Sequence, residues 1–140
     1  MSKRMSIYCI GCGRLTLAVP VNGTKIYPHR PDLSDKRFFQ CPVCGNYVGT
    51  HRDGRPLGTI PTPELRRWRN KVHAVIDEYW LPTRNVIKRK ELYTALSAYL
   101  GREYHTATLG TVEDCTRVID FYEQNFKKQY NNLKKYNQNK

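Results

Sequence analysis

The stretches Cys9-Ile10-Gly11-Cys12 and Cys41-Pro42-Val43-Cys44 decide the fold of this chain. Each is a Cys-x-x-Cys pair, and together they supply four thiolates, the complete tetrahedral shell of a structural zinc ion. Two intervening residues let both sulfurs of a pair face one ion, and the glycines in or after the pairs relieve the tight turn that this requires. The sequence therefore predicts one Zn2+ ion held by Cys9, Cys12, Cys41 and Cys44.

A disulfide framework is the competing interpretation of these cysteines. It would leave Cys115 unpaired, and no signal peptide precedes the first pair, so a metal site in a reducing, cytoplasmic setting fits the pattern better. Four cysteine ligands leave no coordination position open. We therefore expect the zinc ion to hold the fold and to take no part in chemistry.

The composition is strongly basic. Among 140 residues, 24 Lys and Arg face 12 Asp and Glu, which gives a formal net charge of +12. Such an excess attracts polyanions, of which nucleic acid is the commonest, although solubility or an acidic protein partner would explain the same charge. Mean hydropathy is -0.69, and we expect neither a large core nor a membrane span.

Short β-rich runs surround both cysteine pairs and predict a zinc ribbon. We expect strands at residues 5–8, 14–19, 37–40 and 46–50. Asn22-Gly23 predicts a hairpin turn, with residues 25–27 as its returning strand. We assign residues 1–61 to the ribbon and to an irregular connector that follows it.

Helical periodicity dominates the rest of the chain. Thr62-Pro63, Asn85 and Thr111 are candidate helix starts, Leu81-Pro82 ends the first helix, and Gly101 stops the second. Cys115 lies on the apolar stripe of the third helix, so we expect it to be buried and outside the metal shell. The predicted class is α+β: a four-cysteine zinc ribbon of short antiparallel strands packed on about three helices, with residues 62–126 as the helical part and 127–140 as a basic helix extension or frayed tail.

Basic residues concentrate where the ribbon joins the first helix. Guanidinium groups near a helix N-terminus can grip phosphates with two parallel hydrogen bonds, helped by the helix dipole. A solvated basic face is the alternative interpretation. The candidate nucleic-acid-binding residues are Arg52, Arg55, Arg66, Arg67, Arg69 and Lys71.

One flank of the first predicted helix invites a catalytic interpretation. Asp77 lies one turn after His73 and would orient its imidazole, as in an acid/base pair. No matched nucleophile, second carboxylate or catalytic metal motif accompanies the pair. A helix-surface ion pair explains the same residues, so an enzyme is the less favoured interpretation.

The stretch from Cys9 to Trp80 resembles a zinc-finger-containing domain family of uncharacterised function found in phage and prophage proteins. Beyond the cysteine pairs, the resemblance rests on Tyr47-Val48-Gly49-Thr50-His51, on Pro56-Leu57-Gly58-Thr59 and on Glu64-Leu65-Arg66. It implies zinc binding and a phage-type setting, and it brings no known reaction. The motif that carries the resemblance includes residues that zinc binding does not need. It therefore points to a candidate functional cluster: His51, Arg66, Arg69, His73 and Asp77.

The sequence is compatible with three functions. The first is a non-catalytic module of phage type that binds DNA or RNA. The second is a protein-interaction module, such as an inhibitor of a host enzyme. The third, less favoured, is a nuclease-like enzyme that uses His73 and Asp77.

Overall fold

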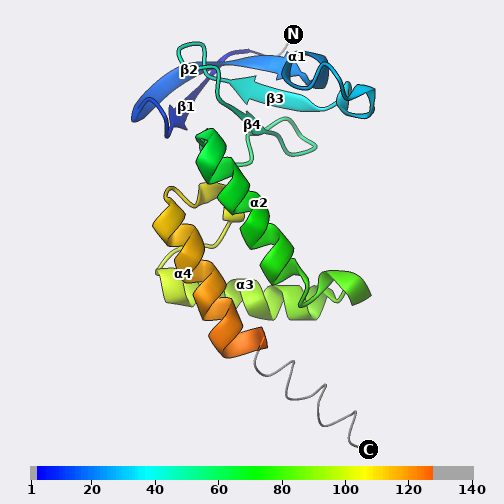
Figure 1. Cartoon of the computed structure of the whole chain (residues 1–140), viewed down its shortest axis with the longest axis vertical. Helices are drawn as coiled ribbons and strands as arrows, with labels where there is room; N and C mark the ends of the chain where they lie inside the picture. Colours follow the sequence, from blue (N-terminus) through cyan, green and yellow to red (C-terminus); the bar gives the residue numbers. More distant parts are fainter. Residues whose placement is uncertain (1–2, 128–140) are drawn as a thin grey trace, which may run out of the picture. The chain divides into compact units, whose positions relative to one another are not determined.

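The computed structural model describes residues 3–127, shown in Figure 1. The chain divides into two compact units, residues 1–66 and residues 67–140, which we call the ribbon unit and the helical unit. The boundary between them falls within a continuous helix, α2 (Pro63–Asp77). The predicted basic extension lies, apart from Lys127, outside the described residues.

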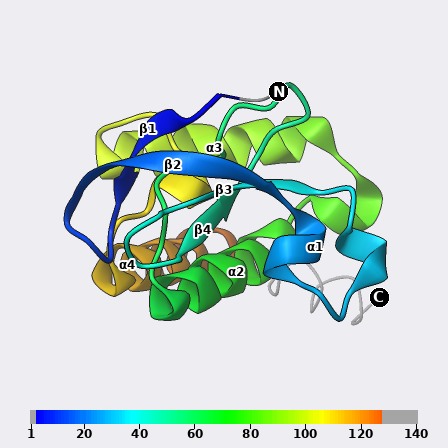
Figure 2. The same cartoon turned by 90° about the horizontal axis from the view of Figure 1, so that it is seen from above.

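The ribbon unit is built on a four-stranded antiparallel sheet. Its strands are β1 (Met5–Cys9), β2 (Arg14–Asn22), β3 (Arg37–Gln40) and β4 (Tyr47–Gly49), in the order β1-β2-β3-β4. The first half of β2 pairs with β1 and its second half with β3, so β2 belongs to both hairpins. Figure 2 shows β2 as a long curved strand. The predicted antiparallel strands around both cysteine pairs are confirmed.

The core of the ribbon unit follows the alternation of its strands. Residues that face inward are buried and their neighbours are exposed, as expected for a sheet with one covered face. Two of the core residues are cysteines, so the apolar core itself is small. The buried cluster consists of Ile7, Cys9, Ala18, Phe39, Cys41, Val48 and Ile60.

The segment after β2 differs from the prediction. The expected returning strand at residues 25–27 is wrong, because the chain forms a short helical turn, α1 (Gly23–Ile26), followed by η1 (Pro31–Leu33). The Asn22 side chain accepts a hydrogen bond from the Lys25 amide at 3.2 Å and so caps a helix instead of turning a hairpin. Gly23 is required here, since a Cβ atom would lie 1.6 Å from the Leu33 carbonyl oxygen.

Helices and short turns make up the helical unit. After α2 come η2 (Leu81–Thr83), α3 (Val86–Leu100), η3 (Thr106–Thr108), α4 (Val112–Tyr122) and a π-helical turn, η4 (Glu123–Lys127). The three predicted caps are confirmed: Thr62, Asn85 and Thr111 each accept a hydrogen bond from an amide three residues later, at 3.0–3.1 Å. Gly101 ends α3 with a positive φ of 73°. The α+β class is confirmed.

One apolar face of each helix is buried in the helical unit. The fully or nearly fully buried residues are Val72, Ile76, Leu92, Leu96, Tyr104, Leu109, Cys115, Val118, Ile119 and Tyr122. The expected burial of Cys115 is confirmed, since its side chain is inaccessible. Among the described residues, no helix has the length and apolar character needed to cross a membrane.

Candidate functional site

The four paired cysteines lie on two similar turns of the ribbon unit. Cys9 ends β1 and Cys41 follows β3, and in each turn the backbone carbonyl of this first cysteine accepts a hydrogen bond from the glycine four residues later. The bonds are 2.8 Å from Gly13 and 3.0 Å from Gly45. Both glycines have positive φ angles, 68° and 81°, which other residues adopt only with strain. The sequence thus encodes two matching turns that aim their sulfurs inward.

The distances between the sulfurs fit a tetrahedral metal ion. Cys9 Sγ lies 3.5 Å from Cys44 Sγ, and Cys12 Sγ lies 3.8 Å from Cys41 Sγ. All four sulfurs lie within 4.8 Å of one another. Zinc–sulfur bonds of about 2.3 Å in a tetrahedron separate neighbouring sulfurs by about 3.8 Å. The four cysteines therefore fit one structural zinc ion.

The electrostatics of the cluster favour a bound cation. Burial and the neighbouring sulfurs raise the pKa of Cys12 to about 12. Burial acts in the same direction on Cys41, but the backbone amides of Cys44 and Val43 and the side chain of Thr16 together lower its pKa to about 6. Four thiolates at this spacing repel one another, and a divalent cation removes that repulsion.

Residues outside the cysteine motif support the two turns. The Gln40 side-chain amide donates to the Gly45 carbonyl oxygen at 2.9 Å, and the Cys41 amide donates to the Asn46 carbonyl oxygen at 2.8 Å. Thr16 is buried and donates to the Ile7 carbonyl oxygen at 3.4 Å. Sequence reasoning missed these residues, because only the strand register brings Thr16 beside the second pair.

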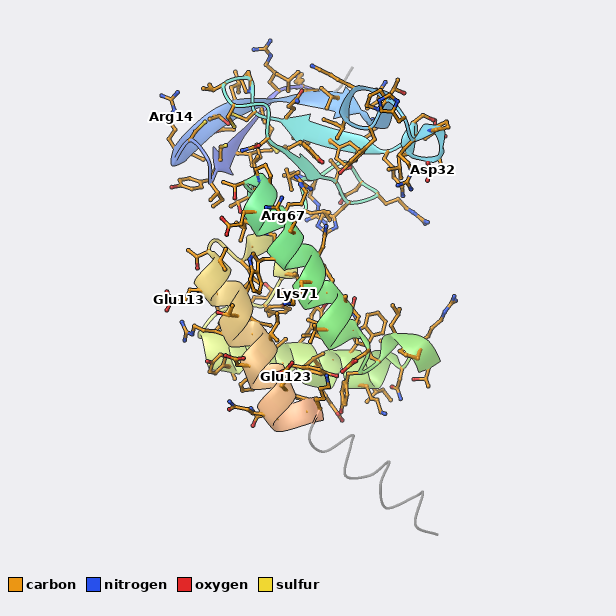
Figure 3. All side chains as sticks on the ribbon, viewed as in Figure 1. Arg14, Asp32, Arg67, Lys71, Glu113 and Glu123 are labelled. Carbon is orange, nitrogen blue, oxygen red and sulfur yellow. The ribbon has the colours of Figure 1, made fainter. Side chains whose placement is uncertain are left out.

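The six predicted nucleic-acid-binding residues divide between the two units. Arg52 and Arg55 are exposed in the ribbon unit, and Arg55 pairs with Asp53 at 2.7 Å. Arg67 and Lys71 are exposed on the part of α2 that belongs to the helical unit, one turn apart (Figure 3).

Arg66 and Arg69 have guanidinium groups in structural contacts, although the buried Arg66 Nη2 atom has no hydrogen-bond partner among the described residues. The Arg66 guanidinium carbon lies 3.8 Å from the centre of the Tyr47 ring, and burial lowers its pKa. Arg69 is 6% exposed and donates through Nε to the Leu109 carbonyl oxygen at 3.0 Å. Both arginines organise the unit in which they lie.

His51 lies in a basic hollow of the ribbon unit that sequence reasoning did not identify. The hollow has a volume of about 500 Å³. Antiparallel pairing of β3 with β4 brings the start of β3 beside the residues that follow β4. Its lining consists of Asp35, Lys36, Arg37, Thr50, His51, Arg52, Asp53 and Gly54.

His73 and Asp77 form the predicted pair in the helical unit. His73 Nδ1 lies 3.3 Å from Asp77 Oδ2, and the Trp80 indole donates to Asp77 Oδ1 at 3.1 Å. A shallow hollow of about 460 Å³ adjoins the pair. The carboxylate thus orients the imidazole, but the hollow's lining offers neither a nucleophilic Ser, Thr or Cys side chain nor a Lys or Arg to stabilise a developing charge.

A family model described as a zinc-finger-containing domain matches residues 5–125. The matched segment includes the four-cysteine cluster, the basic hollow and the His73–Asp77 pair. No curated protein and no solved structure matches the chain.

Proposed function

We propose a function from the premise that the chain belongs to the zinc-finger-containing domain family. The zinc ion stabilises the ribbon, and the protein binds the phosphates of DNA or RNA without catalysing a reaction. The observation that carries the proposal is the basic hollow lined by Lys36, Arg37, His51 and Arg52. A phage-type setting in the cytoplasm, where cysteines stay reduced, belongs to the same proposal.

The charges around the basic hollow suit a phosphate group. The lining contains the carboxylates of Asp35 and Asp53 against the cations of Lys36, Arg37 and Arg52. The Asp53 carboxylate pairs with Arg55, and the backbone amide and guanidinium of Arg55 lower the pKa of Asp53. The Lys36 and Arg52 side chains are exposed. A concave surface with several cations concentrates positive potential where a phosphate can enter.

The remaining predicted residues extend the proposal. Arg55, Arg67 and Lys71 are exposed and supply further phosphate contacts. Arg66 and Arg69 act indirectly, since their guanidinium groups hold Tyr47 and the Leu109 carbonyl. We expect contacts mainly to the backbone of the nucleic acid, because exposed guanidinium and ammonium groups suit phosphate oxygens.

Fluorescence anisotropy with labelled random-sequence DNA and RNA tests the proposal. If six or more phosphates are neutralised, affinity should fall roughly a thousandfold or more between about 50 and 200 mM salt. The double variant Lys36→Ala/Arg52→Ala should weaken binding to all sequences about equally and flatten the salt dependence. Arg14→Ala/Lys25→Ala is the matched control, since it removes the same charge from exposed ribbon residues outside the hollow.

Two results would overturn this proposal. Absence of binding to DNA and RNA at low salt and micromolar protein would exclude nucleic acid as the ligand. Equal losses in the two double variants would show that net charge, and not the basic hollow, determines the binding.

A protein partner is the second candidate, favoured by an apolar patch on the first hairpin. Tyr8 lies opposite Leu15 and Ser6 opposite Leu17, so these side chains share one face. Leu15 is 64% exposed and Leu17 is 54% exposed. If the ligand is a host protein, the native chain should capture one defined protein from nuclease-treated host lysate. The double variant Leu15→Ser/Leu17→Ser should abolish this capture and leave nucleic-acid affinity unchanged.

A further inference from the structure

A second hollow lies in the helical unit, between α3, from Val86 to Ser97, and the segment that follows this helix. We call it the α3 hollow. Its volume is about 460 Å³, which is within the range of small-ligand sites. The residues that matter for its chemistry are Arg89, Lys90, Tyr93, Ser97, Glu103 and His105.

Positive charge accumulates at the end of α3 where a helix favours negative charge. Asn85 caps this helix, and its first turn contains no acidic residue. Lys88, Arg89 and Lys90 follow in succession. The N-terminus of a helix already carries positive partial charge, so Lys88 in the first turn, followed directly by Arg89 and Lys90, is unfavourable in the free protein. A bound anion would remove this repulsion, which is the reason to look for one.

Arg89 is held in place without a carboxylate partner. Its guanidinium carbon lies 4.2 Å from the centre of the Tyr93 ring and 5.4 Å from that of the Trp80 ring. Trp80 is in turn fixed by its hydrogen bond to Asp77. Within residues 3–127, Arg89 forms no ion pair. An arginine has five N–H donors, so Arg89 can interact with the Tyr93 side chain and keep others for a planar pair of phosphate oxygens.

Hydrogen bonds tie the segment after α3 to the helix at the α3 hollow. Ser97 Oγ donates to the Tyr93 carbonyl oxygen at 2.7 Å and accepts from the Tyr104 amide at 2.9 Å. The one carboxylate of the lining, Glu103, lies 3.3 Å from His105 Nε2 and is 85% exposed. It therefore engages the histidine rather than Arg89 or Lys90.

We propose that the α3 hollow binds a phosphate monoester, with Arg89 gripping two of its oxygens and Lys90 supplying a second cation. A monoester carries a charge of about -1.5 to -2 at neutral pH, which the two cations in the lining of the hollow balance. The volume of the hollow suits a single small phosphate-bearing group. A free nucleotide and the 5′-phosphate of a nucleic acid share this chemistry. The site uses none of the ribbon's residues and stands independently of the proposed function.

The test is a ¹⁵N–¹H NMR titration of the zinc-loaded full chain with adenosine 5′-monophosphate, inorganic phosphate and adenosine. The two phosphate compounds should shift the amide signals of residues 86–90 and 93 saturably, while adenosine should not. Amides of the basic hollow, such as those of Lys36 and His51, report separately on the ribbon. The α3 result is therefore readable whether or not the ribbon binds nucleic acid.

Variants and oligonucleotides complete the experiment. Arg89→Gln should weaken binding roughly tenfold or more, and Lys90→Gln should weaken it less. The control Arg102→Gln removes an exposed arginine that makes no ion pair among the described residues, and it should change affinity less than twofold.

The last comparison uses one oligonucleotide with and without a 5′-phosphate. If the phosphorylated form shifts the α3 amide signals more strongly, the ligand is a strand end. If both forms shift the α3 amide signals equally and the nucleotide binds saturably, the ligand is a free phosphate compound instead. The proposal is overturned if no phosphate compound shifts the α3 amides at millimolar concentration. Equal weakening by Arg89→Gln and Arg102→Gln would overturn it as well.

Discussion

The zinc centre gives the sharpest prediction, because replacing one ligand should unfold one unit and spare the other. In Cys41→Ser, a buried ligand loses its thiolate. Structural zinc contributes about 10–16 kcal/mol to folding, so an equal share for each of four ligands is about 2.5–4 kcal/mol. That is a large part of the 5–15 kcal/mol that typically stabilises a domain. Since the ribbon core is small and includes two of the ligands, we expect Cys41→Ser to unfold residues 1–66 at room temperature.

Zinc content and structure must be measured together on this variant. Elemental analysis should give one zinc ion per chain for the native protein and less than one for Cys41→Ser. Far-UV circular dichroism should retain most of the helical signal, because α3 and α4 belong to the other unit. The matched control is Cys115→Ala, which changes a cysteine that is equally buried but lies in the helical core. It should keep its zinc and lose about 1 kcal/mol of stability.

Either of two results would refute this reasoning. A zinc-free native protein, purified without chelator, would show that the cysteines hold no structural metal. Loss of ribbon and helical signals in one transition on removal of zinc would show that the helical unit has no stability of its own.

Three further predictions concern single residues. Gly45→Ala should destabilise the ribbon unit by roughly 1–2 kcal/mol, because its φ is 81°, and unchanged thermal unfolding would contradict this. Arg69→Met should lower the stability of the helical unit by about 1–3 kcal/mol, because the buried Leu109 carbonyl loses a donor; chemical denaturation measures the loss, and an unchanged midpoint would argue against it. Burial raises the pKa of Cys115 to about 11, so little of its thiol is ionised at pH 8. A thiol reagent should therefore label Cys115 at least on the order of a hundredfold more slowly in the folded protein than in the unfolded chain. Rapid labelling in the zinc-loaded protein would show that Cys115 is accessible.

Local signals in the sequence predicted most of the architecture. The cysteine pairs, the caps at Thr62 and Thr111 and the stop at Gly101 each depend on residues only a few positions apart. The same local logic was wrong after β2. There, the side chain of Asn22 formed a helix cap, and Gly23 was needed for a close approach to Leu33, ten residues later.

Long-range contacts account for what the sequence did not show. The buried Arg69 donates a hydrogen bond to the carbonyl oxygen of Leu109, 40 residues later in the chain, and Arg66 lies against the ring of Tyr47. The basic hollow exists because β3 and β4 pair, and no local motif signals that Lys36 will lie near Arg52. A list of arginines near a helix start therefore mixed exposed residues with structural ones.

The shared strand β2 has a consequence for how the ribbon assembles in time. Its pairing with β1 closes a loop of a few residues, and such hairpins form in about 1–10 μs. Its pairing with β3 must wait until the α1–η1 segment has been traversed. We therefore expect Cys9 and Cys12 to be ready first and to capture the metal with two sulfurs. The pairing of β2 with β3, which brings in Cys41 and Cys44 and completes the shell, is then the slow step of folding. Its rate should depend on zinc concentration only while zinc is too scarce to occupy Cys9 and Cys12 beforehand.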